Sequence, residues 1–178
     1  GIYRSYQAAM PEGWTRWTLD QYGFEWENVW DEDVRSGDLS RFDVIILPSQ
    51  NATAIEKGHS AEDMPERYTG GLGLEGATAL QSFVETGGRI IAFDQSINYA
   101  INTFSLPLRN RVDGVTSQDF FIPGSLIRLK IDPTHPLAYG MPAEAVTLFA
   151  RSQVLERTGR GRISTPVCYA ESDFLVSG

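Results

Sequence analysis

Asp94, Gln95 and Ser96 are the residues of this chain whose type and position could support chemistry. They end the apolar run Arg89 to Asp94, which is typical of a buried strand, and they precede residues with helical spacing. A carboxylate at such a strand end can act as a general base or contact a ligand, and it can equally cap the following helix. Both interpretations of Asp94 stay open. Gln50, just past the strand-like run Phe42 to Pro48, is its expected neighbour at the same edge.

A nucleophile for acyl transfer needs a base within hydrogen-bond reach, and neither candidate here has the right surroundings. Ser96 lacks the flanking glycines of a nucleophile elbow and is expected to cap a helix. Cys168 lies in a strand-like run near the end of the chain and is expected to be a buried, inert thiol. We therefore predict no catalytic residue and assign Gln50, Asp94, Gln95 and Ser96 to ligand binding. The alternative is a hydrolase acting around Asp94.

His59 and Glu62 have a spacing that zinc carboxypeptidases use, and His135 could supply a third ligand. His59 lies in a polar loop and His135 stands among prolines, so we predict no metal site in this chain. Zinc binding by the three residues is kept as a separate hypothesis.

The stretch Gly71-Leu-Gly73-Leu-Glu-Gly76 matches the GxGxxG pattern of dinucleotide-binding proteins. That pattern holds a pyrophosphate only where the glycines come directly off a strand, and the preceding strand ends near Pro48. A tightly packed helix start is the favoured interpretation, with dinucleotide binding as the alternative.

Strand-like and helical runs alternate through the first hundred residues. Expected strands cover 2–6, 24–30, 42–48 and 89–94, and expected helices cover 12–22, 74–84 and 97–104. Proline-punctuated strands follow, including 125–131, 146–149, 166–169 and 174–176. The pattern predicts one α/β domain over 1–178, with a doubly wound, mostly parallel sheet whose strands are buried on both faces and a β-rich C-terminal region.

Two features of this predicted arrangement of strands and helices concern ligand binding. Trp14 and Trp17 lie on one side of the first expected helix, where we expect core residues rather than a ligand platform. The polar segment 49–73 is longer than an ordinary connection and leaves the carboxyl end of a parallel strand. It is a candidate cover for a site.

Composition excludes several classes of function. The net charge is −8 and the 15 Lys and Arg residues are scattered, which argues against nucleic acid as a partner. No apolar run approaches the roughly 20 residues that span a bilayer. A single cysteine excludes an internal disulfide.

Four stretches carry a resemblance to a known family: Glu12 to Trp17, Phe42 to Pro48, Tyr68 to Gly73, and Pro123 to Leu126 with Thr134 to Met141. The chain resembles a class I glutamine amidotransferase-like domain, of flavodoxin-like fold, that follows the catalytic unit of bacterial zinc carboxypeptidases. In true amidotransferases a cysteine stands at the turn after the Arg89 strand, where this chain has Asp94-Gln95-Ser96. The resemblance therefore carries no catalytic residue over.

The resemblance implies a non-catalytic accessory domain that packs against the preceding carboxypeptidase unit or binds a small polar ligand or a protein partner. Zinc is expected in that preceding unit and no cofactor in this domain. The parent is expected to be exported, to the periplasm or beyond, and the chain is expected to be a fragment truncated at both ends of the larger protein.

Overall fold

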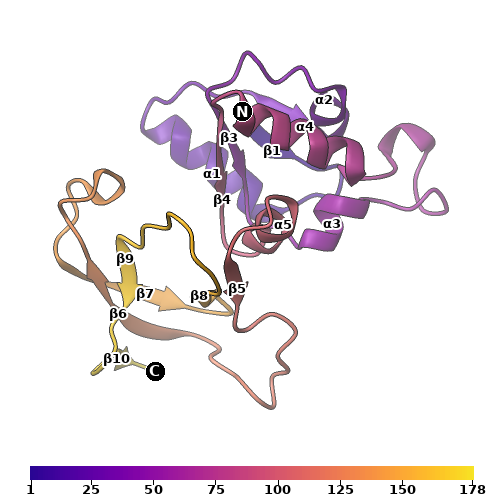
Figure 1. Cartoon of the computed structure of the whole chain (residues 1–178). Coiled ribbons are helices and arrows are strands. Elements are labelled where there is room, and N and C mark those ends of the chain that lie inside the picture. Colours follow the sequence, from indigo (N-terminus) through magenta and orange to yellow (C-terminus); the bar gives the residue numbers. More distant parts are fainter. The chain divides into compact units, whose positions relative to one another are not determined.

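The computed structural model describes all residues, 1–178, and the chain divides into two compact units, Gly1–Leu106 and Pro107–Gly178. The first unit is mixed α/β, and the second is built from antiparallel strands (Figure 1). The mixed α/β class and the β-rich C-terminal region are thus confirmed. That both units form one domain stays a prediction.

Four parallel strands form the sheet of the first unit, in the order β2-β1-β3-β4. The strands are β1 (Ile2–Arg4), β2 (Asn28–Trp30), β3 (Val44–Leu47) and β4 (Arg89–Ala92). Ile46 pairs with Ile2 on one side and with Ile91 on the other, which fixes the register across the sheet. The order reverses at β1, so the crevice beside the ends of β1 and β3 is a topological switch point, where α/β sheets bind ligands.

Four α-helices connect these strands and a fifth follows β4: α1 (Met10–Gln21), α2 (Asp31–Ser36), α3 (Ala52–Lys57), α4 (Gly73–Glu85) and α5 (Ser96–Thr103). The helices α2 and α3 were not predicted, because six residues are too few to show a helical period. Local caps begin and end them. The Asn51 side chain accepts a hydrogen bond from the Thr53 backbone N–H at the start of α3, and Gly37 ends α2 in the left-handed conformation, with φ 78°.

The hydrophobic core of this unit lies on one face of the sheet. Because side chains alternate along a strand, Tyr3, Ile45 and Leu47 point to the face opposite Ile2. There they pack with buried residues from α2 to α5, namely Val34, Ile55, Leu80, Phe83 and Tyr99. Helix α1 covers part of the other face, on the opposite side of the sheet from α4 in Figure 1.

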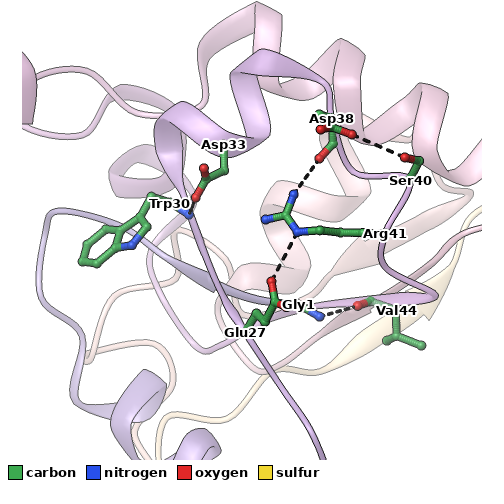
Figure 2. A network of polar contacts seen from close by, with 8 residues as sticks. All are labelled: Gly1, Glu27, Trp30, Asp33, Asp38, Ser40, Arg41 and Val44. Carbon is green, nitrogen blue, oxygen red and sulfur yellow. Dashed lines mark hydrogen bonds and ion pairs between the residues drawn. The ribbon is translucent and has the colours of Figure 1, made fainter.

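Polar contacts tie the loops at the amino ends of the strands together (Figure 2). Arg41 lies between two partners: its Nε donates to the Glu27 carboxylate at 3.2 Å, and its Nη1 donates to the Asp38 carbonyl at 3.0 Å. In the same view the Asp33 carboxylate accepts from the Trp30 backbone N–H at 2.8 Å, which fixes the transition from β2 to α2.

Burial of the strands on both faces was predicted, and for β4 this is wrong. Ile91 is 41% exposed and Phe93 is 44% exposed. Ile91 pairs with Ile46 and therefore lies on the face of the sheet that α1 covers only in part, over β1. β4 lies at one edge of this sheet, with β3 as its only neighbour.

The second unit contains two antiparallel sheets. In the larger one β6 (Ser125–Ile131) pairs with β7 (Glu144–Phe149), β9 (Val167–Tyr169) and β10 (Leu175–Ser177). In the smaller one β5 (Leu108–Asn110) pairs with β8 (Leu155–Arg157). A short 3₁₀ helix, η2 (Pro136–Ala138), follows β6.

The predicted long loop 49–73 contains α3 and a 3₁₀ helix, η1 (Glu66–Tyr68). Its end packs closely against α3: a Cβ at Gly71 would lie 2.4 Å from the Ile55 carbonyl oxygen. Helix α4 begins at Gly73, so the glycine pattern serves a tightly packed helix start, as predicted. None of the helices has both the length and the apolar character that crossing a membrane requires.

Candidate functional site

The turn between β4 and α5 places Asp94 in an unusual backbone conformation. Its φ is 45°, in the left-handed region of the backbone that residues other than glycine seldom adopt. The Asp94 side chain is exposed, and its carboxylate accepts a hydrogen bond from Ser49 Oγ at 2.6 Å. The turns that follow β3 and β4 are therefore joined at this edge of the sheet.

Ser96 takes no part in an exposed site. It is completely buried, and its hydroxyl lies 2.8 Å from the Leu47 carbonyl oxygen and 2.7 Å from the Phe93 carbonyl oxygen. Ser96 is the first residue of α5 rather than its cap, so the predicted N-cap role is wrong. The cap is Gln95, whose side chain is exposed and makes no capping hydrogen bond.

Gln50 follows Ser49, whose hydroxyl donates to the Asp94 carboxylate. The Gln50 side-chain amide donates to the Gln7 carbonyl at 3.2 Å, and the Gln7 side-chain amide donates to the Gly58 carbonyl at 2.7 Å. The structure thus brings Gln50 together with the segment after β1, whereas Asp94, Gln95 and Ser96 belong to the turn after β4.

Gln50 lines a cleft of about 790 Å³ in the first unit, a volume that suits a small ligand. The cleft lies where β1, β2 and β3 end, beside the first turns of α1. It therefore occupies the topological switch point of the sheet. We call it the aromatic cleft, because its lining includes Tyr6, Trp14, Trp17, Trp30 and Tyr68, together with Met64.

Three of the aromatic rings that line this cleft contact one another. Tyr6 stacks on Trp30 with ring centroids 5.0 Å apart, and the Tyr68 ring meets Tyr6 edge-on at 5.1 Å. Both geometries are favourable for aromatic pairs. Tyr68 and Met64 come from the segment 49–73, so this segment contributes one wall of the cleft.

Trp14 and Trp17 were predicted to lie in the core, and this is wrong. Their exposed fractions are 60% and 55%, and their rings form a T-shaped pair at 6.0 Å. Helical spacing shows which residues share a face but not whether anything covers that face. The sequence did contain a signal for an aromatic site, because Tyr6 and Trp30 also fall within the first 30 residues, at the ends of predicted strands.

Two arginines and one glutamate line the aromatic cleft. Arg16 and Glu12 form an ion pair within α1, with Arg16 Nε 2.6 Å from Glu12 Oε1 and Nη2 3.1 Å from Oε2. The charge of Arg16 is thereby balanced. Arg4 has no carboxylate partner; its guanidinium lies over the Trp30 ring, 4.6 Å from the ring centroid.

A buried carboxylate, Asp31, supports the same strand ends from the other face of the sheet. It accepts a hydrogen bond from the Tyr3 hydroxyl at 2.6 Å and one from the Tyr6 backbone N–H at 3.3 Å. Burial raises the pKa of the Asp31 carboxyl, although these hydrogen bonds act in the opposite direction. Burial raises the pKa of Tyr3 as well, and the adjacent carboxylate adds to this effect.

The remaining predicted residues lie elsewhere. Cys168 was expected to be buried and is exposed, because β9 runs along the surface of the second unit. His59 Nε2 lies 3.3 Å from the Tyr6 carbonyl oxygen, and His135 Nδ1 accepts from the Leu137 backbone N–H at 3.2 Å. The structure places no three His, Cys, Asp or Glu residues where they could hold a metal ion together.

No protein-family model matches this chain, and no curated protein matches it. The fold and the site themselves define the class of this chain: a mixed α/β protein with an aromatic cleft at the carboxyl edge of a parallel sheet. Such a cleft can bind a ligand by stacking and by the charge of Arg4. Within the first unit, Asp94 is the one carboxylate residue with a positive φ, and its side chain is exposed.

Proposed function

We propose that this chain is a non-catalytic accessory domain, serving ligand or partner binding, of an exported protein similar to the zinc carboxypeptidases. The observation that carries the proposal is the turn after β4. Where an amidotransferase-like fold needs its nucleophile, the chain has Asp94, and the Ser96 hydroxyl is buried against backbone carbonyls. A serine in that position cannot reach a substrate.

A class I glutamine amidotransferase-like, flavodoxin-like fold is part of this proposal. The parallel strand order β2-β1-β3-β4, with helices on both faces, is compatible with such a doubly wound sheet. The aromatic cleft at the switch point supports a binding role, since it offers stacking surfaces without a catalytic pair. The preceding carboxypeptidase unit would hold the zinc and would be one partner of this domain.

The coding sequence of the parent protein tests this proposal. A zinc carboxypeptidase unit is expected directly upstream, with an export signal before it. A parent without any such unit would overturn the assignment as an accessory domain of that enzyme class, whatever the cleft binds.

A second candidate, a hydrolase acting through Asp94, is favoured by one observation. Asp94 keeps a strained φ of 45° at a turn from strand to helix, and strain of this kind often marks a reactive position. The test is a hydrolase screen with ester and amide substrates on wild type and on Asp94→Asn. Loss of an activity in the variant supports this candidate, whereas equal activity in both proteins removes it.

A further inference from the structure

We propose that the aromatic cleft binds molecules that carry an aromatic ring and a carboxylate, with the carboxylate on Arg4. The inference rests on the ligand-binding half of the proposed function and gives it a chemical class. It follows from two properties of the lining: two indole rings are largely exposed, and one of the two arginines has no carboxylate partner.

The ring component of the ligand follows from the exposed aromatic surface. Trp14 and Trp17 project from α1 with more than half of each side chain exposed, although two rings of this size normally find apolar cover. A planar ligand ring can stack on one indole or meet its edge. Met64 lines the same space, and its thioether also makes favourable contacts with aromatic rings.

The charge of the ligand follows from Arg4. Its guanidinium is the cleft's only cation without a carboxylate partner, because Arg16 is held by Glu12. The lining thus has one unbalanced positive charge in a chain whose net charge is −8. A guanidinium presents paired N–H donors that match the two oxygens of a carboxylate. One cation balances a monoanion better than a phosphate, which carries nearly two charges.

Two sources share this chemistry: a free aromatic carboxylate, and the last residue of a peptide with a free carboxyl end. The experiment uses the full chain and isothermal titration calorimetry, with tryptophan fluorescence as a second readout. N-acetylphenylalanine is compared with N-acetylphenylalanine amide, which lacks the charge, and with N-acetylglycine, which lacks the ring. A tetrapeptide ending in phenylalanine distinguishes the sources, since a peptide site should bind it more tightly than the single residue.

We expect the acid to bind about tenfold more tightly than the amide, as for one charge-assisted contact at a solvated site. Arg4→Gln should abolish this preference and leave binding of the amide unchanged. The matched control is Arg89→Gln, which removes an equal charge from an exposed position at the amino end of β4. It should leave the preference intact.

Removal of a ring tests the stacking part. Trp17→Gln should weaken both the acid and the amide by a similar factor, whereas Tyr22→Gln, at an exposed aromatic residue outside the lining, should weaken neither. Equal affinity for acid and amide would overturn the proposal, as would a preference that survives Arg4→Gln. Binding of a neutral disaccharide alone would also overturn it. A parent protein without a carboxypeptidase unit would leave these results unaffected, so the two failures are distinguishable.

Discussion

At the scale of single residues, Asp94 offers a direct test of its turn. In ordinary backbone, alanine is more favourable than glycine, but a φ of 45° reverses this order because the Cβ atom is disfavoured there. Asp94→Gly should therefore be more stable than Asp94→Ala by about 1 kcal/mol. Both variants lose the contact with Ser49 equally, so their difference reports the backbone alone. Urea unfolding of the two variants measures it.

The adjacent residue supplies the control for this comparison. Gln95 is exposed and has a φ of −63°. There the usual order should hold, with Gln95→Ala more stable than Gln95→Gly by up to about 1 kcal/mol. The same order at both positions would mean that Asp94 is not strained in solution.

Asp31 gives the molecule a pH dependence that can be traced to one carboxyl. Burial raises its folded-state pKa above the ordinary value of about 4, so the folded chain holds this proton to higher pH than the unfolded chain. The stabilisation that comes from this proton is fully present below about pH 4. It is lost as pH rises through the raised pKa. Asp31→Asn should remove this loss, so the variant should gain stability relative to wild type towards neutral pH.

Urea unfolding at a series of pH values, on wild type and Asp31→Asn, checks this expectation. A constant difference between Asp31→Asn and wild type at all pH values would contradict it.

At the scale of elements, the close approach of Gly71 to α3 is a testable constraint. A Cβ at Gly71 would lie 2.4 Å from the Ile55 carbonyl oxygen and 2.8 Å from the Gly58 backbone nitrogen. These are backbone atoms, so the loop must shift. We expect Gly71→Ala to lower the free energy of unfolding by about 2 kcal/mol. Gly13→Ala, where the nearest atom is 4.0 Å away, should be neutral or stabilising. Thermal unfolding of both variants measures this difference in stability.

The elements also show how far the sequence could predict this molecule. Continuous apolar runs correctly predicted the positions of β3 and β4, and apolar positions at helical spacing predicted α4. The short helices α2 and α3 depend on single caps such as Asn51 and leave no period. Their positions could not be predicted.

The candidate site was harder to predict than the fold, because a site depends on what covers each face. Trp14 and Trp17 have the spacing of core residues and are exposed, and Ser96 has the type of an N-cap but its hydroxyl bonds back to the preceding strand ends. The hydrogen bond from Gln50 to the Gln7 carbonyl joins residues 43 positions apart in the chain. Long-range partners of this kind leave no local signal in a single sequence.

At the scale of the whole molecule, the division after Leu106 predicts that the first unit folds alone. Its core cluster is drawn entirely from residues before that point. A chain of this length can bury enough apolar surface for a stable fold. All four tryptophans also lie in this unit, at positions 14, 17, 26 and 30, so their fluorescence reports its unfolding without interference. The fragment 1–106 should show one cooperative urea transition and should keep the cleft.

The full chain provides the comparison for this fragment. Leu80 is fully buried in the same cluster, and Leu80→Ala should destabilise fragment and full chain by a similar amount, about 3 kcal/mol. If the substitution acts equally in both, the core of the first unit is independent of residues 107–178. A fragment with a broad, non-cooperative fluorescence change would show instead that the parallel sheet needs the second unit to fold, and the two units would then form the single domain that the sequence predicts.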